Sequence, residues 1–95
     1  MEVSVHVVIT RNAIKDLAKV PIHIQRKLQL WVMSVKSVGL EETRKISGYH
    51  DEPLRGKREG QRSIRLSQAY RAFYRRLKDG KIEFIQVEEV NKHEY

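Results

Sequence analysis

The segment "YRAFYRRLKDGKIEFIQVEEV", residues 70–90, predicts a β-hairpin that forms the centre of the fold. Both halves are rich in aromatic and β-branched residues, and Asp79-Gly80 between them is a strong signal for a two-residue turn. Closing the hairpin at this turn brings opposite charges together in two cross-strand pairs: Arg76 with Glu83, and Arg71 with Glu88. We therefore expect two long antiparallel strands in this part of the chain.

The N-terminal part of the chain predicts one strand followed by two helices. Residues 2–10 favour a strand that carries apolar side chains along one side, at Val3, Val5, Val7 and Ile9. Thr10 can cap a short helix with apolar residues at helical spacing, namely Ala13, Ile14, Leu17 and Ala18. Pro21 suits the first turn of a second helix, and Gly39 suits the position after its end. The expected core stripe of that helix is Ile24, Leu28, Trp31, Val35 and Val38.

A further helical turn, a loop and one strand lie between the second helix and the hairpin. The sequence "LEETRK" after Gly39 indicates the extra turn, and residues 47–61, with three glycines and a proline, indicate the loop. "RSIRL", residues 62–66, predicts a third strand next to the hairpin. The order is strand, two helices and three strands, which is typical of an α+β fold with helices packed on one face of an antiparallel sheet.

Length and composition describe one folded domain. The chain has 95 residues, 40% of them hydrophobic and 33% charged, so we expect a single domain over residues 1–95. The absence of cysteine excludes a disulfide framework and a zinc-thiolate site. No apolar run approaches the roughly 20 residues that span a membrane, and none resembles the core of a signal peptide. We therefore expect a cytoplasmic protein that does not bind membranes.

The net positive charge is concentrated in one part of the sequence, residues 55–76, which we call the basic segment. The formal net charge of the chain is +7, and the basic segment alone carries eight Lys or Arg residues against one Glu. Its cations are Arg55, Lys57, Arg58, Arg62, Arg65, Arg71, Arg75 and Arg76. Such a concentration of charge predicts a polyanionic partner, most often a nucleic acid.

Several short motifs, taken in order, resemble the RelE superfamily of bacterial toxins, especially its HigB and YoeB branches. "EPLRG" (residues 52–56), Gly60, "SIRL" (63–66) and "YR" (70–71) are similar to the family pattern, and "KHEY" (92–95) is similar to its basic-His-Tyr ending. The resemblance covers most of the chain in element order. It implies a small RelE-like fold and a ribosome-dependent mRNA endonuclease that a cognate antitoxin holds inactive. It also implies that higher-order toxin–antitoxin assemblies can form on operator DNA through the antitoxin.

The residues at these motifs include the groups that RNA cleavage without a metal requires. In that reaction the substrate's own 2′-hydroxyl attacks the phosphorus, so a base, an acid and cations for the developing charge are needed. By resemblance, either Glu52 or His50 is the base, and either His93 or Tyr95 is the acid. Arg65 and Arg71 are expected to stabilise charge, although the cross-strand pair with Glu88 would give Arg71 a structural role instead.

The remaining candidates are positions at which long cations could reach an RNA backbone. We expect Lys57, Arg58, Arg62 and Lys92 to contact RNA or the ribosome, because phosphate contacts require less exact geometry than catalysis. No cofactor is expected. No metal site is expected either, because the four histidines are not paired at ligand spacing.

Two other functions remain open on the same scaffold. One is a ParE-like toxin directed against gyrase, which would act by binding; that branch generally lacks a terminal His-Tyr pair, so "KHEY" is evidence against it. The other is a non-catalytic module that binds RNA or the ribosome, for which the basic strands alone would suffice.

Overall fold

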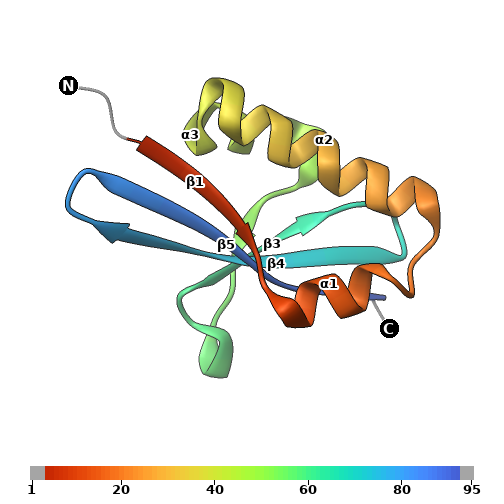
Figure 1. Cartoon of the computed structure of the whole chain (residues 1–95). Coiled ribbons are helices and arrows are strands. Elements are labelled where there is room, and N and C mark those ends of the chain that lie inside the picture. The colour runs from red at the N-terminus through yellow and green to blue at the C-terminus, as the bar shows by residue number, and fades with distance from the viewer. Residues whose placement is uncertain (1–3, 93–95) are drawn as a thin grey trace.

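The computed structural model of the chain describes residues 4–92 and has an α+β fold. A five-stranded sheet has the order β1-β5-β4-β3-β2, with three α-helices inserted after β1 (Figure 1). The elements are β1 (Ser4–Ile9), α1 (Arg11–Leu17), α2 (Ile22–Val38), α3 (Leu40–Arg44), β2 (Glu52–Pro53), β3 (Gln61–Arg65), β4 (Tyr70–Asp79) and β5 (Ile82–Lys92). Two short 3-10 helices, η1 (Ser47–Tyr49) and η2 (Gly56–Arg58), lie in the connections on either side of β2.

The sheet differs in two details from the one expected. β1 pairs with β5 in parallel, so the sheet is mixed, because the helices that follow β1 carry the chain back before the hairpin forms. The segment expected to be a loop contains the additional short strand β2, which pairs with β3. The remaining pairs are antiparallel, as expected.

The helix boundaries follow the local signals in the sequence. Thr10 caps α1, since its side-chain oxygen accepts a hydrogen bond from the backbone N–H of Ala13. α2 follows Pro21 and ends at Gly39, whose φ of 88° lies in a region that glycine adopts at low cost. A separate helix, α3, follows and is joined to α2 by a hydrogen bond of 2.7 Å between the hydroxyls of Ser34 and Thr43.

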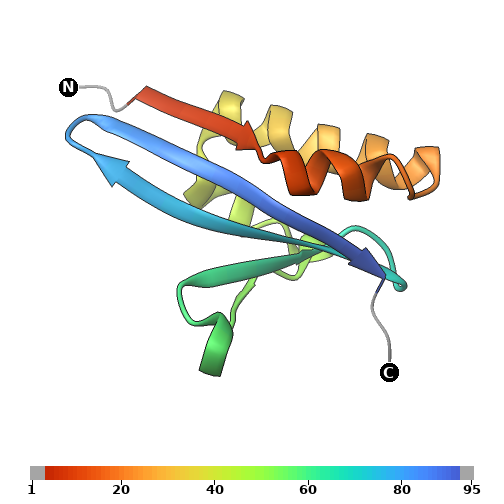
Figure 2. The ribbon, with the colours of Figure 1, turned by 60° about the horizontal axis from the view of Figure 1, so that its bottom comes forward.

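The core lies between the helices and one face of the sheet. α1 and α2 lie on the same side of the sheet, and the connection that carries η2 projects on the other side (Figure 2). Of the expected stripe of α2, Val38 is wrong because it is exposed, whereas the other four residues are buried. Trp31 from this stripe packs on Tyr74 of β4 with 5.0 Å between ring centroids.

The hairpin forms as expected, but with a different register. Asp79 pairs with Ile82, so the turn residues are Gly80 and Lys81, and Gly80 has a positive φ of 60°. A bulge between Phe73 and Tyr74 then shifts the register again. The expected partners are therefore wrong: Arg76 lies opposite Ile85, and Arg71 lies opposite Asn91. Arg76 still reaches Glu83 diagonally, with 3.0 Å between Nη2 and Oε2.

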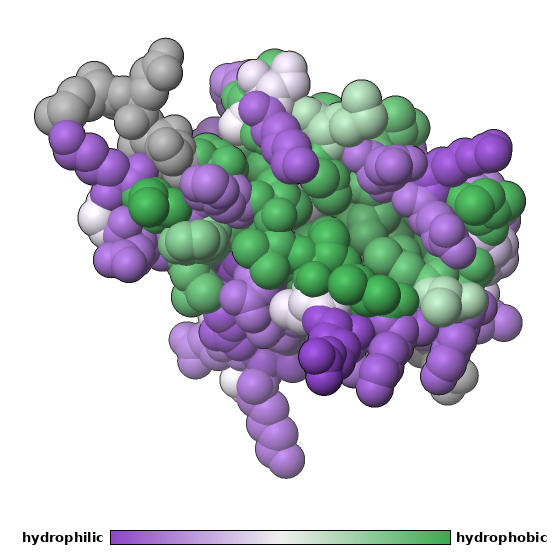
Figure 3. Space-filling view, viewed as in Figure 1, coloured by the Kyte–Doolittle hydropathy of each residue, from purple (hydrophilic) through white to green (hydrophobic). Residues whose placement is uncertain are grey.

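Some apolar surface remains exposed on the helical layer. A continuous hydrophobic area crosses the face of the molecule where α2 lies above β1 and α1 (Figure 3). In residues 4–92, no helix is long and apolar enough to cross a lipid bilayer.

Candidate active site on the open face of the sheet

Alternation along the strands divides the charged residues between two faces of the sheet. Ala72 and Tyr74 of β4 point to the helices and are buried, so Arg71 and Phe73 point to the other side. We call that side the open face. The pairings Ser63 with Phe73 and Arg65 with Arg71 place the β3 residues of these pairs on the open face as well. Glu52 joins them because it pairs with Ser63.

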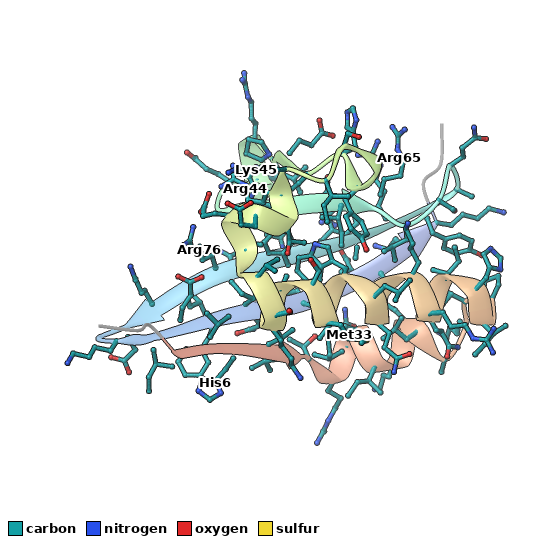
Figure 4. All side chains as sticks on the ribbon, turned by 90° about the horizontal axis from the view of Figure 1, so that it is seen from above. His6, Met33, Arg44, Lys45, Arg65 and Arg76 are labelled. Carbon is teal, nitrogen blue, oxygen red and sulfur yellow. The ribbon has the colours of Figure 1, made fainter. Side chains whose placement is uncertain are left out.

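Four of these residues form a polar cluster at the end of the open face. Nη1 of Arg71 lies 3.1 Å from Oε1 of Glu52 and also donates to the hydroxyl of Ser63, at 3.5 Å. Ser63 is fully buried beneath this pair, so it holds the guanidinium from the side of the sheet. Arg65 lies directly opposite Arg71 and extends away from the body of the molecule (Figure 4). The Arg65 side chain has no hydrogen bond or ion pair to any described residue.

This cluster offers an anion two guanidinium groups and a carboxylate. A phosphate that contacts Arg65 can also reach Arg71, where it competes with Glu52 for the same guanidinium nitrogen. Planar guanidinium groups bind phosphate through two parallel hydrogen bonds, so two of them on neighbouring strands suit a phosphodiester with developing negative charge. Glu52 remains partly exposed, with 44% of its side chain accessible, so a substrate hydroxyl can reach it.

A second group of side chains lies further along the open face, and ion pairs neutralise its charges. Arg58 lies over the ring of Phe73, at 4.4 Å from its centroid, and binds Glu89 at 2.7 Å. Glu88 accepts hydrogen bonds from Gln61 and Arg75 next to it. Sequence reasoning did not identify Phe73 or these carboxylates as part of the surface, although the alternation of Arg71, Phe73 and Arg75 along one strand was a usable signal.

The loop that carries His50 and Glu52 is fixed to the opposite side of the sheet by the residue between them, Asp51. Its buried carboxylate lies 2.6 Å from Nε of Arg62 and accepts a hydrogen bond from the hydroxyl of Tyr74. Arg62 therefore points towards the helical side, away from Arg65. Burial raises the pKa of Tyr74 far above its usual range, and the hydrogen bond and charge of Asp51 raise it further. Burial opposes the charge on Arg62, but Asp51 outweighs burial and raises its pKa.

The other candidates lie around the cluster or outside the described residues. His50 is exposed and has a left-handed backbone, with φ of 48°, which a histidine seldom adopts. Lys57 is exposed on η2, and Lys92 ends β5 opposite Tyr70, next to Arg71. His93 and Tyr95, the two expected acids, lie outside the described residues, so their roles stay predictions.

Most of the basic segment is neutralised within the fold. Five of its eight cations form ion pairs with carboxylates: Arg58, Arg62, Arg71, Arg75 and Arg76. The other three, which have no ion pair to any described residue, are Arg55, Lys57 and Arg65. The concentration of charge in the sequence therefore serves structural pairing to a large extent, and Arg65 is the unpaired cation that lies within the polar cluster.

Comparison with known proteins shows the fold. No protein-family model and no curated protein sequence matches the chain significantly. The structure of the YoeB/ParE toxin from Agrobacterium tumefaciens is similar, with a TM-score of 0.71 and 20% identity over 94% of this chain and 99% of that one. YafQ from E. coli strain BL21(DE3) gives a TM-score of 0.67 and 17% identity over 92% of this chain and 91% of that one.

A chain of the E. coli DinJ–YafQ toxin–antitoxin complex is also similar, with a TM-score of 0.63 and 19% identity over 92% of this chain and 90% of that one. These likenesses extend over nearly the whole of each chain. The fold implied by the resemblance in sequence is thus confirmed: this chain has the RelE-like fold of these toxins.

Proposed function

We propose that this chain is the toxin of a type II toxin–antitoxin system and that it cleaves mRNA on the ribosome. The observation that carries the proposal is the cluster of Glu52, Ser63, Arg65 and Arg71 on the open face, in a chain with the fold of YoeB and YafQ toxins. Glu52 and Ser63 hold Arg71 in place, and the Arg65 side chain opposite it has no partner among residues 4–92, so both guanidinium groups can turn to one phosphate.

The proposed reaction is an intramolecular transesterification of RNA. The 2′-oxygen forms a bond to the adjacent phosphorus as a base removes the 2′ proton, and the bond to the 5′-oxygen breaks as an acid protonates that oxygen. The products are a 2′,3′-cyclic phosphate and a 5′-hydroxyl end. Negative charge develops on the non-bridging oxygens in the transition state, so cations fixed beside the phosphorus lower the barrier.

The placement of Glu52, Arg65 and Arg71 supports a division of roles among these three candidates. Arg65 and Arg71 bind the scissile phosphate, and Glu52 or His50 takes the 2′ proton. When a phosphate displaces Glu52 from Arg71, the carboxylate becomes available beside the substrate. His93 or Tyr95 supplies the proton to the leaving oxygen.

Binding of the rest of the RNA and of the ribosome is proposed to involve the rim of the open face. Lys57 is exposed on η2, which projects on that side, and Arg58 lies over Phe73, where the ring and the guanidinium together offer a stacking surface. Lys92 is less suited to this role, because it pairs with Tyr70, which packs against the core, so Lys92 lies on the helical side of the sheet. Arg62 is less suited to this role than the sequence indicated, because Asp51 holds its guanidinium on the other side of the sheet.

The proposed partner in the cell is a cognate antitoxin. The DinJ–YafQ complex joins a toxin of this fold to its antitoxin. We propose the same arrangement here, in the cytoplasm, with assembly on operator DNA through the antitoxin.

The test is cleavage of a defined mRNA by the purified chain in the presence of programmed ribosomes. We expect cuts that appear only with ribosomes and leave 5′-hydroxyl ends, detected by primer extension and by labelling of the ends with kinase without prior phosphatase treatment. Ends with a 5′-phosphate would contradict the mechanism. Binding without cleavage would favour the RNA-binding module.

A gyrase-directed activity is the second candidate, because one of the similar structures is described as a YoeB/ParE toxin. Induction of the chain alone separates the two. We expect translation to stop and mRNA to be cut before DNA replication is affected, whereas early DNA damage with intact mRNA would favour the gyrase alternative.

A further inference from the structure

Phe73 and Glu89 form a small site on the open face, and a side chain of the same protein, Arg58, occupies it. The two residues lie opposite each other on β4 and β5. The guanidinium of Arg58 lies over the Phe73 ring, 4.4 Å from its centroid, and donates to the Glu89 carboxylate, with 2.7 Å between Nη2 and Oε2. A flat group that carries N–H donors is therefore stacked on an aromatic ring and bonded to a carboxylate.

The contacts of Arg58 are open to exchange. Its side chain is 43% exposed and that of Glu89 is 28% exposed, and ion pairs so close to solvent contribute little to stability. Its other hydrogen-bond partner among the described side chains is the amide of Gln61, at 3.2 Å. Arg58 comes from η2, which projects on this side of the sheet, so its side chain can leave the ring while the strands stay in place (Figure 2).

The site lies next to the guanidinium cluster that is proposed to bind the scissile phosphate. Phe73 follows Arg71 by two residues on the same face of β4, so their side chains begin about 7 Å apart. Ser63, which accepts a hydrogen bond from Arg71, is the β3 partner of Phe73. The base of a nucleotide next to a phosphate on Arg71 can therefore reach the Phe73 ring.

The carboxylates at this site favour a base over a phosphate. Glu88 and Glu89 line a recess of about 460 Å³, together with Thr10, Asn12, Arg58 and Gln61. Glu88 is held by Gln61 and Arg75, whereas Arg58 is the one described side chain bonded to Glu89. When Arg58 leaves, Glu89 therefore has free acceptor oxygens. A carboxylate repels a phosphate but accepts hydrogen bonds from the N–H groups of a base.

Of the four bases of RNA, guanine matches the group that Arg58 presents. Its Watson–Crick edge carries two adjacent N–H donors, at N1 and on the 2-amino group, in a flat unit that resembles a guanidinium. A carboxylate accepts both at once, as it does from arginine. Adenine, cytosine and uracil present a donor next to an acceptor on this edge, which would leave one carboxylate oxygen facing a lone pair.

We propose that Phe73 and Glu89 form a recognition site for a guanine base of the substrate RNA, with Arg58 as its internal occupant. The base stacks on the ring in place of the guanidinium, and Glu89 accepts the hydrogen bonds from N1 and the 2-amino group. The displaced Arg58 turns to the RNA backbone. This assignment rests on the proposed function, since it takes RNA as the substrate, and it adds a preference for guanine beside the scissile phosphate.

The test compares short RNAs that differ in one base and carry equal charge. Fluorescein-labelled uridine hexamers with guanosine, adenosine or inosine at the third position are titrated with the full chain, and binding is measured by fluorescence anisotropy. Because the backbone charge is the same in each RNA, the ratio of two dissociation constants reports recognition of the base. Inosine keeps N1–H and the O6–N7 edge of guanine but lacks the 2-amino group.

We expect the wild-type chain to bind the guanosine RNA about tenfold more tightly than the adenosine RNA, with the inosine RNA between them. Glu89→Gln should bring the guanosine-to-adenosine ratio close to one, because an amide offers one donor and one acceptor. The matched control is Glu42→Gln, the same change at an exposed residue of α3, which should keep the wild-type ratio. Arg58→Ala should weaken the binding of both RNAs through the lost charge, with a ratio at least as large as in wild type.

Three results would overturn the assignment. Equal affinity of the wild-type chain for the guanosine and adenosine RNAs, or a ratio that Glu89→Gln leaves unchanged, would exclude Glu89 as the reading group. Loss of the ratio in Arg58→Ala, with inosine bound as tightly as guanosine, would mean that Arg58 itself reads the O6–N7 edge. Displacement of the RNA by an equal concentration of guanosine monophosphate would make a free nucleotide the ligand.

The binding ratio also separates this assignment from the proposed function. A guanine preference in binding without any cleavage on programmed ribosomes would retain the site and refute the endonuclease. Cleavage on ribosomes with a binding ratio of one would refute the site alone. If both hold, wild-type cuts on programmed ribosomes should concentrate at codons with guanine beside the cut, and Glu89→Gln should lose this preference.

Discussion

Replacement of Asp51 by alanine tests whether one buried carboxylate holds the candidate catalytic loop in place. The Asp51 side chain is 1% exposed and has three partners: Arg62 at 2.6 Å, the hydroxyl of Tyr74, and Nε of Arg44 at 3.9 Å. Asp51→Ala leaves a largely buried guanidinium without its counter-ion, a change that typically costs about 3–5 kcal/mol, and leaves a buried hydroxyl without an acceptor, which costs about 1–3 kcal/mol. These costs overlap, and the Arg62 side chain keeps 22% of its exposure, so we expect a loss of about 3 kcal/mol in the free energy of unfolding.

The size of this effect is measurable for a domain of this length. A small domain is stable by about 5–15 kcal/mol, so Asp51→Ala should stay folded while its urea midpoint falls clearly and its m-value does not change. Asp51→Asn keeps an acceptor oxygen and should lose about half as much. Asp51→Ala/Arg62→Met removes the orphaned charge and should recover part of the loss.

The same variants test whether Asp51 positions the site. Because His50 and Glu52 flank Asp51 in the chain, Asp51→Asn should reduce cleavage of ribosome-bound mRNA under conditions where the variant is fully folded, with ribosome affinity unchanged. A loss of less than about 1 kcal/mol for Asp51→Ala, or a double variant as unstable as the sum of its two single variants, would refute the reasoning.

Three further predictions address the site and its surroundings. Arg71→Ala should lower the cleavage rate about 10²–10³-fold, whereas Lys78→Ala, about 23 Å further along β4, should not; an equal loss in both would indicate a general charge effect. Stability should fall as pH rises above about 10, because Tyr74 ionises in the unfolded chain but not in the folded one, and Tyr74→Phe should reduce the slope of unfolding free energy against pH. Lys57→Ala should weaken ribosome binding and reduce its salt dependence, while His93→Ala should slow single-turnover cleavage at unchanged affinity; the reverse pattern would exchange their roles.

Local signals in the sequence were sufficient for most elements of the fold. Thr10, Pro21 and Gly39 mark helix boundaries that the structure keeps, because capping and backbone conformation act within a few residues. The hairpin was also predicted, but its register was not. The turn shifted by one residue to Gly80 and Lys81, and the bulge between Phe73 and Tyr74 shifts the register again, without a glycine or proline at that point to indicate it in the sequence.

The candidate site was predicted in part for a related reason. Arg65, Arg71 and Glu52 do come together, and the motifs "EPLRG", "SIRL" and "YR" identified one of the three each. Their structural partners were not identified, because Ser63 and Asp51 lie many residues from the arginines they bind and look like ordinary polar residues in a loop and a strand. The predicted pair of Arg71 with Glu88 was replaced by pairs of Arg71 with Glu52 and of Arg75 with Glu88.

The ion pairs of the fold show that only part of the basic segment is available to bind a polyanion. In the sequence its cations account for the entire net charge, which indicated one long polyanion surface. In the fold, carboxylates from α3, the β2 region and β5 neutralise five of them. Of the arginines in the polar cluster on the open face, Arg65 alone has no ion pair to a described residue. The helical layer also carries an excess, because residues 11–38 hold six Lys or Arg residues against one carboxylate, Asp16, but the count over the whole chain outside the basic segment balances and so conceals it. The net charge of the chain therefore does not describe one binding surface: most cations of the basic segment pair with carboxylates of the fold, and a small guanidinium site on the open face remains suited to a phosphate.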